Sequence, residues 1–240
     1  MSTDHQVSIV TGASSGIGRA IALALGTLGG TIALVGRDAR RLKEVTELVR
    51  IRGARAEAYE ADLGIDADIL RVANAVRNDF GGADVLIHSA GIFRMGSIAD
   101  APLADIDLLY RTNVRAPYAL TQVLLPLIAK RQGQIVFINS SAGLSSRASV
   151  GAYAASKHAL KAIADALRAE VNAAGVRVIT VYPGRTATPQ QQSIHEQEGK
   201  RYQSDRLLQP EDVASAVLSA LAMPRTAEVT DISIRPMQKA

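Results

Sequence analysis

Short apolar segments alternate with longer segments of helical periodicity along the whole chain. Two of the short segments, 134–139 and 176–181, are nearly continuous runs of β-branched and other apolar residues. Such runs are typical of strands buried on both faces of a parallel sheet. Between the strands, apolar residues recur at helical spacing, as Ile69, Val72 and Val76 do. The predicted strands are 6–11, 31–36, 54–59, 84–88, 134–139, 176–181 and 229–234.

Alternation of strands and helices predicts right-handed β-α-β connections. These connections would build a Rossmann-type, doubly wound α/β fold, in which a seven-stranded parallel sheet carries helices on both faces. A chain of 240 residues is long enough for one such core and short for two, and 48% of it is hydrophobic. The sequence shows no internal repeat, low-complexity tract or linker. We therefore expect residues 1–240 to form a single domain.

Composition and charge argue against several classes of protein. The net charge of +4 is spread along the chain without a block of Lys and Arg, so nucleic acid is not an expected partner. The chain has no Cys and its first residues lack the basic and apolar regions of a signal peptide. The longest uncharged apolar run, 20–36, contains Gly26, Gly29 and Gly30, which predict a helix end and a turn, not a membrane span. We expect a cytoplasmic protein without a membrane partner and, because its four His are scattered, without a metal site.

A glycine-rich turn joins the first predicted strand to a helical pattern. Thr11 ends the strand, and glycines follow at 12, 16 and 18. A dinucleotide-binding site needs this context: Gly12 permits the tight turn, Gly16 lets the backbone approach a pyrophosphate, and Gly18 allows close packing of helix on strand. Free N–H groups at the helix start would face the phosphates. The spacing is G-x-x-x-G-x-G, not the common G-x-G-x-x-G, and a merely flexible turn is the alternative.

The same turn also fits the G-x-S-x-G pattern of α/β-hydrolases, with Ser14 as the nucleophile. That interpretation requires an oxyanion-binding N–H from an earlier strand–helix loop, but only residues 1–11 precede the turn. It also requires an acid and then a histidine, and neither His158 nor His195 stands in a recognisable supporting context. The dinucleotide interpretation is therefore favoured over the hydrolase interpretation.

Tyr153 and Lys157 stand four residues apart, a spacing that places two side chains on the same face of a helix. A free phenol has a pKa of about 10 and is a poor acid or base at neutral pH. A neighbouring ammonium favours the phenolate and lowers that pKa. The pair is therefore a candidate general acid–base, while a helical tyrosine and a solvated lysine without a shared role are the alternative.

Several short motifs occur in a defined order along the chain. They are TGASSGIG at 11–18, Asp62-Leu63, Ser89-Ala-Gly91, Asn113, Ser140, Tyr153-x-x-x-Lys157 and Pro183-Gly184. Any one of them could arise by chance, but their order and approximate spacing resemble the short-chain dehydrogenase/reductase family. The resemblance extends from Val7 to Pro236. It implies an NAD(P)-dependent enzyme that transfers a hydride between the nicotinamide and a carbonyl or secondary alcohol.

The resemblance also assigns catalytic roles to four residues. During reduction, Tyr153 would protonate the developing alkoxide and Ser140 would stabilise it. Lys157 would lower the pKa of Tyr153 and bind the nicotinamide ribose. The backbone of Asn113 would hold a water that links Lys157 to solvent.

Ser140 follows a predicted strand, at the carboxyl edge where parallel sheets bind their ligands. Ser141 is the rival, because it carries the same hydroxyl one position later. We prefer Ser140 because the segment 140–143 aligns with the family motif.

The end of the second predicted strand distinguishes the two nicotinamide cofactors. An acid about twenty residues beyond the glycines favours NAD, whereas an Arg accommodates the 2′-phosphate of NADP. By the family pattern Gly36 occupies the acid position, and the planar guanidinium of Arg37 can pair bidentately with a phosphate. Ser15 stands where some relatives carry a second basic residue. We expect NADP(H), with NAD(H) as the alternative in which Asp38 holds the ribose and Arg37 is solvated.

The remaining cofactor contacts follow from the resemblance by position. After the fourth strand most relatives carry Asn-Asn-Ala-Gly, whereas this chain carries His88-Ser89-Ala90-Gly91. Ala90 and Gly91 keep the close backbone approach, and His88 is expected to be packed and neutral. Thr186 stands where relatives often carry Val or Ile. The expected cofactor-binding residues are Gly12, Ser14, Ser15, Gly16, Ile17, Gly18, Arg37, Asp62, Leu63, Ser89, Ala90, Gly91, Tyr153, Lys157, Pro183, Gly184, Thr186 and Thr188.

The substrate is expected to be a small carbonyl compound or alcohol. Segment 185–209 is the expected lid on the substrate side, and it is mostly polar and charged. Phe93, Met95 and Leu144 could line an apolar pocket. The Ala-rich segment 152–174 has apolar positions on more than one face, which predicts cover from the sheet and from a second subunit. The resemblance implies a homodimer or homotetramer.

A nucleotide-binding regulator or scaffold with the same fold but no turnover is the alternative function. That alternative predicts losses among the catalytic residues. Ser140, Tyr153 and Lys157 are all present, so the enzyme is the favoured interpretation.

Overall fold

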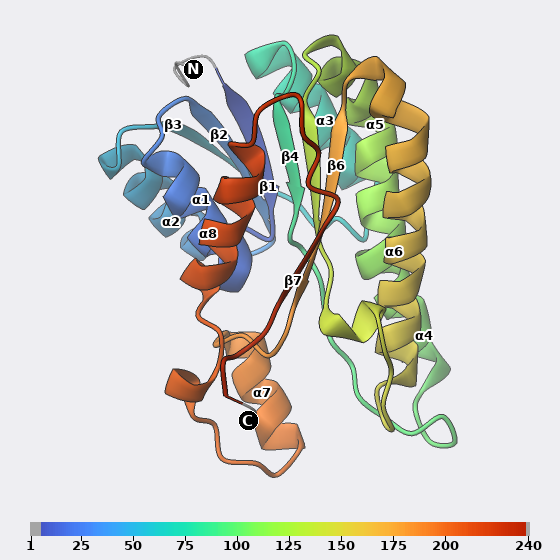
Figure 1. Cartoon of the computed structure of the whole chain (residues 1–240). Coiled ribbons are helices and arrows are strands. Elements are labelled where there is room, and N and C mark those ends of the chain that lie inside the picture. Colours follow the sequence, from blue (N-terminus) through green and yellow to red (C-terminus); the bar gives the residue numbers. More distant parts are fainter. Residues whose placement is uncertain (1–5, 239–240) are drawn as a thin grey trace.

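A parallel β-sheet of seven strands runs through the centre of the protein (Figure 1). The structure is a computed structural model that describes residues 6–238; residues 1–5 and 239–240, the ends of the predicted 1–240 domain, lie outside the described residues. Each predicted strand is present, with its ends shifted by at most two residues. In spatial order the strands are β3 (Arg55–Glu60), β2 (Thr31–Gly36), β1 (Val7–Thr11), β4 (Val85–His88), β5 (Gln134–Ile138), β6 (Arg177–Pro183) and β7 (Asp231–Ile234), and all neighbouring pairs are parallel.

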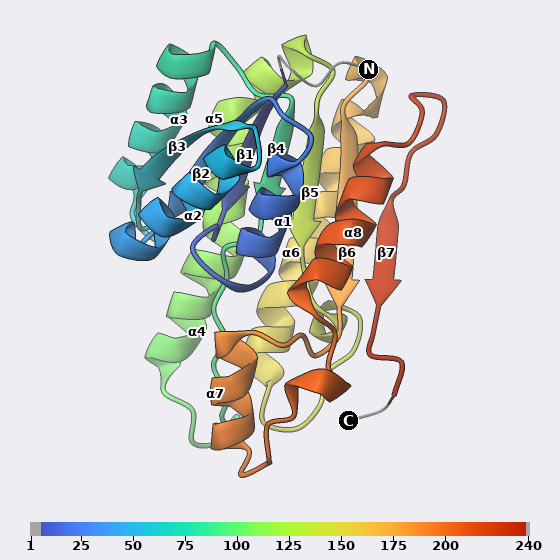
Figure 2. The same cartoon turned by 90° about the vertical axis from the view of Figure 1, so that its left-hand side faces the viewer.

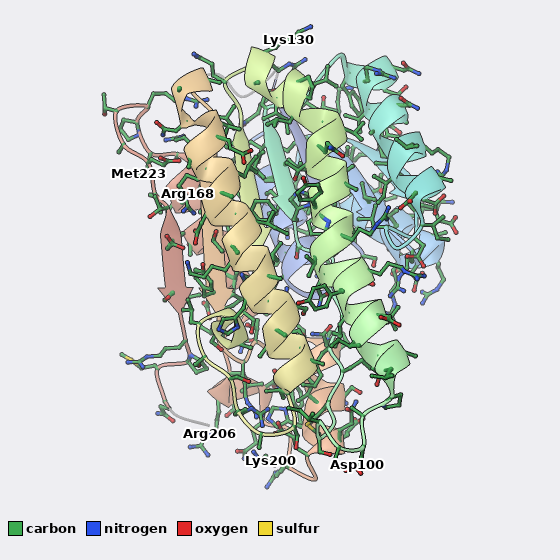
Figure 3. The ribbon with its side chains drawn as sticks, turned by 90° about the vertical axis from the view of Figure 1, so that its right-hand side faces the viewer. Asp100, Lys130, Arg168, Lys200, Arg206 and Met223 are labelled. Carbon is green, nitrogen blue, oxygen red and sulfur yellow. The ribbon has the colours of Figure 1, made fainter. Side chains whose placement is uncertain are left out.

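Helices cover both faces of the sheet, so the predicted Rossmann-type fold is confirmed. The helices are α1 (Gly16–Gly26), α2 (Ala39–Ile51), α3 (Asp66–Phe80), α4 (Leu103–Tyr110), α5 (Ala116–Lys130), α6 (Gly151–Val171), α7 (Pro189–Gln197) and α8 (Pro210–Leu221). On one face lie α1, α2 and α8 (Figure 2), and on the other lie α3, α5 and α6 (Figure 3). Residues 6–238 form one domain. None of its helices combines the length and the apolar character that a bilayer span requires.

Two hydrophobic cores, one on each side of the sheet, hold these layers together. Successive residues of a strand point to opposite faces, so the neighbours Ile9 and Val10 of β1 belong to different cores. Ile69, Val72 and Val76 are buried against the sheet from α3, as their helical spacing predicts. Because helices cover both faces of the sheet, β1, β5 and β6 are buried on both sides. This explains why their sequences are mostly apolar runs without polar alternation.

The order of the strands places a crevice at one edge of the sheet. β1 lies between β2 and β4, so the chain leaves it toward one side first and later returns to the other. In open α/β sheets, ligands bind at the carboxyl ends of the strands where this reversal occurs. The turns after β1, β4, β5 and β6 meet at that edge, and α7 lies beyond it (Figures 1 and 2).

Candidate active site

A cleft of about 500 Å³ opens at the carboxyl edge of the sheet. Every predicted catalytic and cofactor-binding residue lines it except Asn113, which is buried behind the wall. The predicted residues on the cleft are Gly12, Ser14, Ser15, Gly16, Ile17, Gly18, Arg37, Asp62, Leu63, Ser89, Ala90, Gly91, Ser140, Tyr153, Lys157, Pro183, Gly184, Thr186 and Thr188.

The glycine turn after β1 is packed too closely for larger residues. Gly12 has a φ of +66°, and a Cβ there would lie 2.8 Å from the Cα of Ala90. A Cβ on Gly18 would lie 2.4 Å from the carbonyl oxygen of Gly12. The turn and close-packing roles expected for these two glycines therefore follow from the structure.

The same turn is hydrogen-bonded to the loop after β4. The Oγ1 of Thr11 accepts from the backbone N–H groups of Ser89 (3.0 Å) and Ala90 (3.1 Å). Helix α1 begins beside this contact, with no acidic residue in its first turn and no hydrogen bond from the Ser15 side chain to its N-terminus. The free N–H groups and the positive end of the helix dipole then face the cleft. This narrow cradle fits the pyrophosphate of a dinucleotide.

Two arginines mark the end of the cleft beyond β2. Arg37 is 65% exposed, and its Nη1 lies 4.0 Å from Oδ2 of Asp62. Arg41, which sequence reasoning missed, also lines the cleft, four residues after Arg37 and within the first turn of α2. Asp38 caps α2: its Oδ1 accepts from the Arg41 N–H (2.9 Å), and its Oδ2 lies 3.3 Å from the Arg41 Nε. The carboxylate of Asp38 is thus engaged within α2, and the two guanidinium groups suit a phosphate.

Lys157 is buried one helical turn after Tyr153. Its Nζ lies 5.9 Å from the centroid of the Tyr153 ring and donates to the carbonyl of Ile138 (3.3 Å). Asn139 Nδ2 donates to the backbone carbonyl of Lys157 (3.1 Å), which fixes α6 to the end of β5. Burial lowers the pKa of Lys157 to about 8. Burial raises the pKa of Tyr153 above its ordinary value, and a hydrogen bond with Ser140 only partly opposes that shift. The net shift is therefore opposite to the lowering expected from Lys157.

Ser140, rather than Ser141, lies beside the phenol. It lies two residues after the end of β5 and caps a short 3₁₀ turn, with its Oγ accepting from the N–H of Ala142 (3.1 Å). The hydroxyl also takes part in the hydrogen bond with Tyr153. Ser141 lines the cleft as well, but the contact with the phenol belongs to Ser140.

Asn113 sits in a π-helical turn, Arg111–Arg115, between α4 and α5. Its Oδ1 accepts from the N–H of Ile92 (2.9 Å), and its Nδ2 donates to the Ile92 carbonyl (3.0 Å) and to the Ser156 Oγ (3.1 Å). The side chain therefore ties the loop after β4 to α6. Irregular turns of this kind are frequent at functional sites, and the water-holding role of the Asn113 backbone stays a prediction.

His88 is packed inside the protein, as expected. Its ring stacks on Phe137 with 4.9 Å between centroids, and its Nε2 is 2.8 Å from the Oγ1 of Thr121. Burial lowers the pKa of His88 to about 3, so the imidazole is neutral at physiological pH and joins β4 to α5.

The hydrolase interpretation finds no support in the positions of the two candidate histidines. His158 is exposed on α6, where its Nδ1 lies 2.8 Å from the Ala154 carbonyl oxygen. His195 is buried in α7 and is bonded to Gln191. In the described part of the chain, neither of these two imidazoles is hydrogen-bonded to Ser14.

The part of the cleft next to Tyr153 has both apolar and cationic walls. Phe93 packs edge-on against Tyr153 with 4.8 Å between ring centroids. Val150 and Ile194 add apolar surface, and Arg147 and Arg185 add charge. The sequence contained no signal for these two arginines beyond the nearness of Arg147 to Tyr153 and of Arg185 to Pro183-Gly184. The expectation for Met95 and Leu144 is wrong: neither residue lines the cleft, and Leu144 is 49% exposed.

Comparison with known proteins gives consistent results. The family model described as short chain dehydrogenase matches residues 6–199. An uncharacterized oxidoreductase of Staphylococcus epidermidis is 32% identical over 97% of this chain and 98% of its own length. A metagenomic short-chain oxidoreductase solved with NADP is 31% identical, with a TM-score of 0.85 and full coverage of both chains. A short chain dehydrogenase from Burkholderia cenocepacia, also solved with NADP, is 30% identical over 98% of both chains, with a TM-score of 0.86.

Proposed function

Since the chain belongs to the short-chain dehydrogenase family, we propose that it is an NADP(H)-dependent oxidoreductase acting on a carbonyl or secondary alcohol. The observation that carries this proposal is that Tyr153, Ser140 and Lys157 line the same cleft as the glycine turn. The NADP complexes of two relatives support the choice of cofactor. In the reducing direction the enzyme is a carbonyl reductase.

The side chains around the phenol supply the proton chemistry. The nicotinamide, when bound, supplies the hydride for reduction or accepts it during oxidation. In reduction Tyr153 donates its proton to the developing alkoxide, and Ser140 donates a hydrogen bond to the same oxygen. The ammonium of Lys157 stabilises the phenolate that remains. A water held by the Asn113 backbone then returns a proton to Tyr153.

Different parts of the cleft are assigned to different parts of the cofactor. The N–H groups of the glycine turn hold the pyrophosphate, and Lys157 holds the nicotinamide ribose. We assign the 2′-phosphate to Arg37 and add Arg41, because both guanidinium groups lie at that end of the cleft. The engagement of Asp38 as the cap of α2 argues against the NAD(H) alternative.

In the proposed enzyme, segment 185–209 forms the lid over the substrate side of the cleft, and α6 forms the subunit interface. The lid carries α7 and contributes Arg185 and Ile194 to the cleft. On α6, Leu160 and Leu167 are buried in the core while Ala155 stays exposed, which leaves a second face for a partner. We expect a homodimer or homotetramer, and light scattering that shows only a monomer would contradict this. A cytoplasmic location stays a prediction.

The central experiment follows NADPH oxidation with a panel of ketones, aldehydes and quinones. Tyr153→Phe is expected to lower kcat by roughly 100-fold or more, because a general acid contributes 10²–10⁴-fold. Tyr118→Phe, on the exposed side of α5, is the matched control and should retain full activity. NADPH fluorescence checks that both variants bind the cofactor.

Two results would change the proposal. Turnover that survives Tyr153→Phe overturns the assigned acid. Tight NADPH binding without turnover on any compound of the panel favours the regulator or scaffold instead.

A further inference from the structure

Four charged side chains meet at the substrate end of the cleft, and we call them the Glu198 cluster: Arg147, Arg185, Glu198 and Lys200. The Nη2 of Arg185 donates to both carboxylate oxygens of Glu198, at 2.9 and 2.8 Å. The Nη2 of Arg147 donates to Oε1 at 2.6 Å, and the Nζ of Lys200 lies 3.2 Å from Oε2. The Glu198 side chain is only 7% exposed. One buried carboxylate therefore holds three cations.

The Glu198 cluster carries an excess of positive charge. Burial raises the pKa of Glu198, but hydrogen bonds from Arg185, Arg147 and Lys200 outweigh it and lower that pKa to about 2. Glu198 is thus ionised at neutral pH and supplies one negative charge. Across residues 6–238, none of the three cations forms an ion pair with a second acid. Two positive charges remain uncompensated beside the cleft.

Two of the cations line the cleft itself. Arg147 precedes Tyr153 on the loop that leads into α6, and a backbone bond from the Gly96 N–H to the Ser149 carbonyl (2.8 Å) holds that loop. Arg185 follows β6, and its carbonyl accepts from the Leu208 N–H (3.1 Å). Both guanidinium groups are therefore carried by anchored backbone.

The acids on the cleft lie at its other end. Among the described residues, the acids that line it are Asp38 and Asp62, next to Arg37. Lys200 does not line the cleft, and it lies at the rim of the molecule beyond the carboxyl edge (Figure 3). The wall near Tyr153 is thus cationic and apolar, without a lining carboxylate.

We propose that Arg147 and Arg185 bind a carboxylate of the substrate, so that the enzyme acts on a carbonyl compound with an anionic group and an apolar body. The inference rests on the proposed function. A planar guanidinium presents several N–H donors to a carboxylate, and Arg147 and Arg185 are each hydrogen-bonded to Glu198 through Nη2 alone. Glu198 keeps the two arginines beside each other, and the apolar body of the substrate packs on Phe93 and Ile194.

The test measures binding to the NADP⁺-saturated protein by calorimetry. The ligands are 4-formylbenzoate and 4-formylbenzamide, which differ in charge but hardly in shape. Wild type is expected to bind the carboxylate roughly tenfold more tightly or better, the factor typical of one charge-assisted hydrogen bond. Arg147→Gln should abolish the preference, and Arg147→Lys should keep part of it, because the charge remains without the planar fork.

Lys200→Gln is the matched control. Lys200 pairs with the same Glu198 but does not line the cleft, so the preference should persist in this variant. Equal binding of the two ligands by wild type, or no measurable binding of the carboxylate, overturns the inference. A preference that survives both Arg147→Gln and Arg185→Gln also overturns it.

Two further measurements show which anion the arginines prefer and whether they bind the substrate or the cofactor. Tighter binding of 4-formylphenyl phosphate than of 4-formylbenzoate overturns the assignment to a carboxylate. If the arginine variants weaken the binding of NADP⁺ but not the binding of the aldehyde, the two side chains bind the cofactor and the inference fails. NADPH oxidation with the same aldehydes tests the proposed function separately. If the protein prefers the carboxylate ligand but does not turn it over, the result supports the anion site and contradicts the proposed oxidoreductase activity.

Discussion

Replacing Lys157 with Met is expected to stabilise the fold while it removes the proposed chemistry. Lys157 is 5% exposed, and burial lowers its pKa from 10.5 to about 8. At pH 7 such a difference between folded and unfolded chain corresponds to a destabilisation of about 3 kcal/mol. The hydrogen bond from Nζ to the Ile138 carbonyl (3.3 Å) offsets roughly 1 kcal/mol of it. Met fills a similar volume without a charge, so the net gain is about 2 kcal/mol.

The sign of the pH dependence follows from the lowered pKa. Between pH 8 and 10.5 the unfolded chain holds the Lys157 proton more strongly than the folded protein does. The stability of wild type therefore rises with pH through this window, and below it the penalty is constant. The advantage of Lys157→Met should be full at pH 7 and lost by pH 10.5, where the hydrogen-bond offset exceeds the remaining burial penalty.

Differential scanning calorimetry at the two pH values measures this effect. A gain of about 2 kcal/mol corresponds to a Tm increase of roughly 4–8 °C in a domain of this size. Lys161→Met is the matched control: Lys161 lies one turn later on α6, is partly exposed and pairs with Asp165 (2.5 Å), so its loss should not raise Tm. A Lys157→Met protein that is less stable than wild type at pH 7, or whose advantage does not change with pH, refutes the reasoning.

Other substitutions test the cofactor site. Gly18→Ala should abolish NADPH binding measured by fluorescence and lower the free energy of unfolding in urea, because its Cβ would lie 2.4 Å from the Gly12 carbonyl oxygen. Gly26→Ala in the same helix meets no atom closer than 3.4 Å and should leave binding intact. Arg37→Gln should raise the KM for NADPH roughly tenfold or more and leave the KM for NADH unchanged, since only NADPH carries the 2′-phosphate. Asp38→Ala should cost about 1 kcal/mol through loss of the α2 cap; a selective loss of NADH use in this variant would restore the ribose role of Asp38.

The fold could be predicted because its signals are local. Continuous apolar runs such as 134–138 and the helical spacing of Ile69, Val72 and Val76 record which faces are buried. Backbone hydrogen bonding then allows few arrangements of such segments, and right-handed crossovers leave one parallel sheet. The glycine turn was equally readable, because the positive φ of Gly12 and the tight packing of Gly18 permit no larger residue.

The charged residues that meet at the wall of the cleft could not be predicted from the sequence. Glu198 meets Arg147 across 51 positions of sequence, and no periodicity connects them. Arg41 faces the cleft because α2, which Asp38 caps, directs its side chain toward the cleft.

Local patterns of burial and turn geometry were enough to specify the sheet, its helices and the positions of Tyr153 and Lys157. The tertiary packing alone decided which charges meet, which hydroxyl touches the phenol, and how far burial shifts the pKa of Lys157. The physical reason is that electrostatic and desolvation energies depend on distances between side chains that are remote in sequence.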